Sequence, residues 1–188
     1  MQINWVLGSL FLIFTLSCCK NEKIEKVNPL QNTVDSLQNV IYCQEEEIHQ
    51  LHETIDSLPL GPPLDTLIQS SKFGWRKSPV SGRWQMHSGI DYMAAWYDTV
   101  YCTGSGVVIK SGWNLGYGRQ IKVKHALGYE STYSHLYRMF VRKGDSVIVG
   151  QPIGRAGNSG MVTGPHLHYE VIRNNIKTNP SPYIRNLK

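Results

Sequence analysis

The spacing of apolar residues changes once along this chain and divides it into two parts. Between residues 30 and 58, apolar residues recur at alternating steps of three and four, the heptad pattern of a coiled-coil helix. From about residue 70 the spacing becomes two, which indicates short strands with one buried face. Prolines and a glycine at 59–63 separate the two parts, because they end helices. The sequence therefore predicts a helix followed by an all-β domain.

The heptad positions of this helix favour pairing with a second copy. β-Branched residues at a and leucine at d are typical of parallel dimers, and the polar Gln44 would fix the register. The alternative is a helix that folds back as an amphipathic cover on the domain, but a narrow a/d stripe fits a two-helix seam better. The a positions are Val34, Ile41, Ile48 and Ile55, and the d positions are Leu30, Leu37, Gln44, Leu51 and Leu58.

The first 19 residues resemble the signal of an exported bacterial lipoprotein. The uncharged run at 5–17 is too short for a transmembrane helix, which needs about 20 apolar residues, but suits a signal peptide. It ends at Cys18-Cys19, as in a lipobox, and either cysteine could carry the lipid. The alternatives are a cleaved signal with incidental cysteines or a short uncleaved anchor. We expect a lipid-anchored protein of the cell envelope, facing the periplasm or cell wall.

The net charge also differs between the two parts of the chain. Residues 1–71 carry 3 basic and 9 acidic side chains, a net charge of −6. Residues 72–188 carry 16 basic and 5 acidic side chains, a net charge of +11. A basic domain suits a polyanionic partner such as an anionic cell-wall polymer. Nucleic acid is not indicated, because the sequence contains no nucleic-acid-binding motif.

The second part reads as short strands separated by glycine turns. Ile121, Val123 and His125 share one strand face, so His125 is expected to be a packed residue rather than a ligand. Cys102 is expected to be buried, and Cys43 lies too far away in sequence to form a metal-type pair with it. The predicted strands cover 99–102, 106–110, 119–125, 130–135, 146–149 and 166–172.

Three places in this part carry histidine in a chemical setting. His87 and Asp91 form a His-x-x-x-Asp motif, and His135 ends a predicted strand. His166 and His168 are two apart on a strand, so their side chains converge on one face. A His/Asp/His set with one open position is a catalytic zinc arrangement. Five groups are available and three suffice, which leaves two histidines for proton transfer.

Taken together, the motifs resemble the lysostaphin/LytM-type zinc endopeptidases over residues 73–183. The matching stretches are Gly74-Trp75-Arg76, His87-x3-Asp91, Gly116-Tyr117-Gly118, Tyr133-Ser134-His135-Leu136, Lys143-Gly144-Asp145, Gly150-Gln151-Pro152-Ile153-Gly154, Thr163-Gly164-Pro165-His166-Leu167-His168-Tyr169-Glu170 and Asn179-Pro180. The resemblance implies a small β-rich domain of the duplicated-hybrid-motif type, with a groove over an antiparallel sheet. It implies that His87, Asp91 and His168 bind one Zn²⁺ and that His135 and His166 are catalytic. The family cleaves peptide bonds in peptidoglycan cross-bridges and stems.

The resemblance also allows a second function. Some coiled-coil relatives have lost site residues and act as non-catalytic regulators that activate cell-wall amidases; here all five residues are present, which favours the enzyme. Tyr133 could donate to an oxyanion, although a packing role fits a strand residue better. The stretch 94–99 lacks a glycine usual in the family.

The expected organisation is signal 1–19, tether 20–29, coiled coil 30–58, linker 59–71 and zinc metalloendopeptidase domain 72–188.

Overall fold

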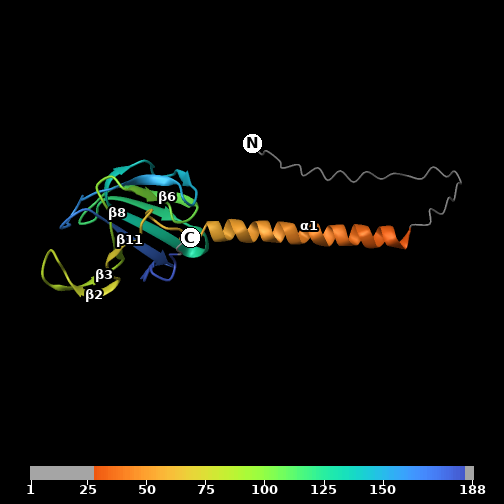
Figure 1. The fold of residues 1–188 in the computed structure, drawn as a ribbon, viewed down its shortest axis with the longest axis horizontal. Coiled ribbons are helices and arrows are strands. Elements are labelled where there is room, and N and C mark those ends of the chain that lie inside the picture. Colours follow the sequence, from red (N-terminus) through yellow and green to blue (C-terminus); the bar gives the residue numbers. More distant parts are fainter. Residues whose placement is uncertain (1–27, 185–188) are drawn as a thin grey trace, which may run out of the picture. The chain divides into compact units, whose positions relative to one another are not determined.

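A computed structural model describes residues 28–184, in which one helix precedes a β-sheet domain (Figure 1). Helix α1 spans Pro29–Asp56, so the predicted helix is confirmed to within two residues at its end. The side chain of Asn28 accepts a hydrogen bond from the amide of Leu30 at 3.2 Å and caps the helix start. Within 28–184, no helix is long and apolar enough to cross a membrane. The expected signal and lipobox at 1–19 lie outside the described residues.

The domain is built on one antiparallel sheet, which confirms the predicted all-β fold. Its main path runs β1-β4-β11-β8-β7-β6-β9, with β10 pairing β5 and β8, and β12 pairing β11. A separate hairpin of β2 and β3 projects from the sheet (Figure 1). The strands are β1 Gln69–Ser71, β2 Gly74–Lys77, β3 Trp84–His87, β4 Ile90–Met93, β5 Thr99–Tyr101, β6 Gly106–Asn114, β7 Gly118–Lys124, β8 Tyr129–Met139, β9 Ser146–Val147, β10 Pro152–Ala156, β11 His166–Arg173 and β12 Ile176–Thr178; the 3-10 turn η1 is Ala126–Gly128.

Strand alternation places the core on one face of β11 and the chemistry on the other. Leu167, Tyr169 and Val171 are fully buried in the core, while His166, His168 and Glu170 alternate with them on the other face. Thr103 Oγ1 lies 2.8 Å from the Tyr133 hydroxyl and 2.9 Å from the Tyr169 hydroxyl. With the Ser131 hydroxyl, which donates to Tyr133 at 3.0 Å, these contacts satisfy the two buried phenols. Tyr133 therefore packs inside the domain, as its strand position indicated.

The segment between the helix and β1 packs with the sheet. Leu64 is buried and belongs to the same hydrophobic core as the strands. The amide of Gly61 donates to the carbonyl of Thr103 at 2.8 Å, and the amide of Tyr101 donates to the carbonyl of Pro63 at 3.0 Å. Residues 61–64 are thus held by backbone hydrogen bonds and apolar contact, and truncations of the domain need to retain them.

His125 is a packed residue, as its lack of a partner motif predicted. Its Nδ1–H donates to the carbonyl of Ser105 at 2.9 Å, and its Nε2 lies 2.7 Å from the Ser131 hydroxyl. Burial lowers the pKa of His125, because desolvation of the charged ring outweighs the opposing effects of the Ser105 carbonyl and Glu130. The folded domain therefore prefers this ring neutral.

This preference predicts a loss of stability in mild acid. Below the ordinary histidine pKa of 6.5, the unfolded chain binds a proton at His125 that the folded chain binds less readily. The free energy of unfolding therefore decreases as the pH is lowered. We expect His125→Gln to flatten the slope of stability between pH 7 and pH 5. Urea unfolding of both proteins across that range measures it. Identical slopes would show that His125 is protonated equally easily in both states.

Candidate metal centre

Three strands bring together the side chains of His87, Asp91 and His168. His87 ends β3, Asp91 lies on β4, and His168 lies directly opposite Asp91 on the neighbouring β11. His87 Nε2 is 3.0 Å from Asp91 Oδ1 and 3.1 Å from His168 Nδ1, which is 2.8 Å from Asp91 Oδ1. All three residues are buried. The structure therefore joins, at one point, three residues that lie up to 81 positions apart.

The outer hydrogen bonds of the two rings show that this point suits a cation. His87 Nδ1 is 2.7 Å from the carbonyl of Lys72, which can only accept, so the ring donates there and turns its bare Nε2 inward. His168 Nε2 faces the carboxylate of Glu170 at 3.1 Å, so His168 turns its bare Nδ1 inward. Two lone pairs and a carboxylate oxygen then meet with no hydrogen between them. Nitrogen and oxygen donors of this kind fit a divalent transition metal such as zinc.

Electrostatics at the cluster favour a positive charge. Burial alone would raise the pKa of Asp91, but its close contacts with His168 and His87 outweigh it and hold the pKa well below its usual range. Burial likewise opposes charge on His168, yet its contacts with Asp91 and Glu170 raise its pKa. Arg76 donates to the second oxygen, Asp91 Oδ2, at 3.2 Å and leaves Oδ1 facing the two rings.

His135 lies beside this cluster at a break in the sheet. Strand β8 pairs with β11 up to Ser134 and with β10 from Leu136, so His135 occupies the point where the partner strand changes. Its φ of 64° is in the left-handed region, which a residue with a side chain adopts at a cost that is common at functional sites. Its Nδ1–H donates to the carbonyl of Ser159 at 2.8 Å, and burial lowers its pKa to about 4. The ring is therefore neutral and presents Nε2 as a proton acceptor.

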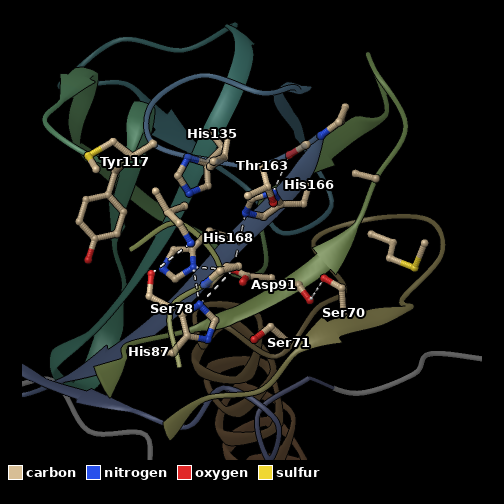
Figure 2. Close-up of a pocket in the computed structure, with 18 of the residues that line it drawn as sticks. Ser70, Ser71, Ser78, His87, Asp91, Tyr117, His135, Thr163, His166 and His168 are labelled. Carbon is tan, nitrogen blue, oxygen red and sulfur yellow. Dashed lines mark hydrogen bonds and ion pairs between the residues drawn. The ribbon is translucent and has the colours of Figure 1, made fainter. Parts of the chain in front are cut away.

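His166 faces the same space from β11. Its Nδ1–H donates to the carbonyl of Gly164 at 2.9 Å, which leaves Nε2 bare. That Nε2 is 3.8 Å from Asp91 Oδ1, farther than the cluster atoms are from one another. Its ring centroid is 4.8 Å from that of His135, and both rings lie on the same side of the cluster (Figure 2). All five residues line a groove of about 1110 Å³.

Four further residues support the site and were not identified as functional from the sequence. Glu170 contacts His168, Lys177 contacts Glu170, and Tyr117 has its ring centroid 5.5 Å from that of His168. The fourth is Arg76, described above. Glu170 could have been found, because it continues the alternation of His166 and His168 along one strand face. Hydrogen bonds from His168, Lys177 and Ser88 outweigh burial and lower the pKa of Glu170 to about 2, so it is a carboxylate.

Comparison with known proteins assigns this arrangement to a family. Residues 85–180, which carry all five site residues, match the sequence profile described as Peptidase family M23. The chain belongs to peptidase family M23. This confirms the resemblance to lysostaphin-type enzymes. Residues 85–180, called the M23 domain below, therefore belong to a metallopeptidase family.

Curated relatives of the M23 domain include wall-active enzymes. The peptidoglycan DD-endopeptidase ShyC of Vibrio cholerae is 43% identical over 122 residues, which are 64% of this chain and 28% of ShyC. The DD-carboxypeptidase/endopeptidase Mpg of Neisseria meningitidis is 40% identical over 111 residues, which are 59% of this chain and 26% of Mpg. The chain thus spans little more than a quarter of the length of either relative.

Solved structures share the fold of the M23 domain. A zinc-containing peptidase from Vibrio cholerae has a TM-score of 0.59 and 36% identity, covering 65% of this chain and 38% of that one. The catalytic domain of lysostaphin from Staphylococcus simulans has a TM-score of 0.58 and 30% identity, covering 62% of this chain and 91% of that one. The lysostaphin match spans nearly the whole catalytic domain, which supports the predicted groove over an antiparallel sheet.

Proposed function

We propose that the M23 domain is a zinc-dependent endopeptidase that hydrolyses peptide bonds in peptidoglycan cross-links or stem peptides. The observation that carries the proposal is the convergence of His87, Asp91 and His168 on one point, with His135 and His166 facing the same groove. His87, Asp91 and His168 would hold one zinc ion. Bound zinc would supply Lewis acidity, polarising the scissile carbonyl and making water a better nucleophile.

The chain's own groups suit the proton transfers of amide hydrolysis. His135 and His166 each donate Nδ1–H to a backbone carbonyl and so keep Nε2 free toward the groove. Either ring can take the proton of the attacking water and return it to the leaving amine. The other ring, when it carries a proton on Nε2, would donate to the carbonyl oxygen and stabilise the negative charge that develops there. The two backbone carbonyls fix the ring orientations in advance, which is what efficient proton transfer requires.

The substrate class is supported by the relatives and by charge. ShyC and Mpg are named for endopeptidase activity, and the net charge of +11 over residues 72–188 suits an anionic wall polymer. The alternative, a non-catalytic activator of amidases, would not require His135 and His166 to face the groove beside the metal cluster. Incubation of purified peptidoglycan with the protein, followed by mass spectrometry, should reveal cleaved cross-links or stems. Products cut only in the glycan strand, or none, would contradict the proposal.

We further propose that α1 forms a parallel coiled-coil dimer. The side chains at its a and d positions are exposed, including Ile41 and Ile48 at about half of their surface. A chain lacking the first 20 residues should run as a dimer in light scattering, and Ile41→Asp with Ile48→Asp should make it monomeric. Tyr42→Asp with His49→Asp, at the adjacent b positions, is the matched control and should remain dimeric. A monomeric parent chain would exclude the dimer.

We also propose that the chain is anchored by lipid at Cys18 or Cys19, which would hold the M23 domain in the cell envelope beside its substrate. Metabolic labelling with a fatty-acid probe should mark the protein. The double change Cys18→Ala with Cys19→Ala should abolish the label, whereas Cys43→Ala, an exposed cysteine on α1, should leave it intact. Labelling of the double variant would place the lipid elsewhere and refute the proposal.

A further inference from the structure

The carboxylate of Glu170 is built into the site behind His168. Glu170 lies two residues after His168 on β11, so both side chains emerge on the same face. Glu170 is 2% exposed, and its Oε1 is 3.1 Å from His168 Nε2. A carboxylate only accepts hydrogen bonds, so the contact holds the proton of a neutral His168 on Nε2 and keeps Nδ1 bare toward His87 and Asp91.

A tight hairpin brings a lysine to the same carboxylate. Asn174 and Asn175 connect β11 to β12, and both have positive φ, as a two-residue turn of this kind requires. This register places Lys177 opposite Ile172, which shares the strand face of Glu170. Lys177 Nζ is 2.8 Å from Glu170 Oε1, so the buried negative charge is paired.

The lysine also reaches a groove-lining phenol. Lys177 Nζ is 3.1 Å from the Tyr117 hydroxyl and 5.3 Å from the centroid of its ring. The Tyr117 ring in turn stacks on that of His135, with centroids 6.5 Å apart and planes 19° from parallel. The Ser88 hydroxyl, next to His87 in sequence, donates to Glu170. Glu170 thus contacts the metal cluster through His168, and Lys177 contacts the groove-lining Tyr117.

We propose that Glu170 and Lys177 form a positioning pair: Glu170 orients His168 toward the metal, and Lys177 holds Tyr117 at the groove. The inference rests on the proposed function, because it presumes that the cluster binds zinc. The competing explanation is an ion pair that only stabilises the fold. The chain supplies a matched control in Lys122 and Glu130, whose ion pair at 3.1 Å joins β7 to β8 on the same sheet.

Metal binding by the full chain tests the role of Glu170. We expect Glu170→Ala to lower zinc affinity about 10- to 100-fold, the usual effect of losing a carboxylate behind a metal-bound histidine. Glu170→Gln keeps an acceptor for His168 Nε2–H and should recover part of that loss. Affinity is measured by competition with a chromophoric chelator. The absorption of the cobalt-substituted protein should also change in Glu170→Ala, because ring orientation alters the ligand field. Glu130→Ala should match wild type in both measurements.

Hydrolysis tests the role of Lys177. Lys177→Met should retain zinc and lower kcat more than it raises KM, because the groove loses a fixed Tyr117 rather than a substrate contact. In a Tyr117→Phe background the same change should have a much smaller effect, since the hydroxyl that Lys177 contacts is then absent. Lys122→Met should leave kcat unchanged. An effect of Lys177→Met that is undiminished in the Tyr117→Phe background would refute the coupling.

The two hypotheses fail in different ways. Wild-type zinc affinity and cobalt absorption in Glu170→Ala would overturn the role of Glu170, even if the protein hydrolyses peptidoglycan. If Glu170→Ala does not fold, the isosteric Glu170→Gln decides: a lower zinc affinity with an altered cobalt spectrum supports the role, and wild-type values overturn it. Normal zinc binding without hydrolysis of any wall preparation would instead refute the proposed endopeptidase, while the effect of Glu170 on zinc would remain measurable.

Discussion

Replacing His168 with alanine should abolish both zinc binding and hydrolysis. His168 supplies one of the three donors that meet at the centre, and its Nδ1 lies 2.8 Å from Asp91 and 3.1 Å from His87. Removing it leaves two donors, too few to hold zinc firmly in a site of this type. Metal content of the purified variant, measured beside kcat/KM, gives both results at once.

The neighbouring histidines should separate the two properties. His166→Ala and His135→Ala should keep nearly one zinc per domain and lose about 10²- to 10⁴-fold in rate, the usual contribution of a general acid or base. His166 is the sharper comparison, because it lies on the same strand face as His168 yet its Nε2 is 3.8 Å from Asp91 Oδ1. If His166→Ala loses the metal and His168→Ala keeps it, the assignment of the two residues is reversed. If none of these changes affects hydrolysis, the regulatory function gains support.

The sequence predicted six of the twelve strands that the structure describes in residues 28–184 and missed the other six. Strands β5 to β9 and β11 lie where an apolar residue at every second position indicated them. The hairpin β2–β3 was missed although Trp84-Gln85-Met86-His87 alternates apolar and polar residues. Trp75, Trp84 and Met86 are exposed, so the alternation there does not mark a buried face. Strand β10 contains a proline and a glycine, which indicate a turn when read locally. Its pairing with β5 and β8 depends on tertiary contacts that local spacing does not encode.

The site was predictable to the extent that its residues occur in local motifs. His166 and His168 converge because of strand geometry alone, and His87 and Asp91 belong to one motif. The contact between Arg76 and Asp91 depends on how the projecting hairpin meets the sheet, which no spacing reveals. The contact of Lys177 with Glu170 follows from the register set by Asn174-Asn175, so recognising that turn would have suggested it.

A methyl group added at Gly89 should damage the metal centre although none of the three proposed ligands is itself replaced. Gly89 lies midway between His87 and Asp91, in the two-residue connection from β3 to β4. A Cβ there would lie 2.3 Å from the carbonyl oxygen of Tyr169 and 2.9 Å from His168 Cε1. The first contact is with backbone, so the connection itself must move. A shift of that connection displaces both ligands that flank it and presses on the third.

We therefore expect Gly89→Ala to cost about 1–3 kcal/mol of stability, as overpacking in a dense region does. Zinc affinity should fall as well, because the ligand geometry has to change with the backbone. Gly112→Ala is the matched control: Gly112 lies on β6 with no atom within 4 Å of its added Cβ and no positive φ, so this change should leave stability and zinc affinity nearly unaltered. Urea unfolding with and without zinc separates the two effects. If Gly89→Ala binds zinc as tightly as wild type does, the connection can move without displacing His87 and Asp91. The expected link between this connection and the metal centre would then be wrong.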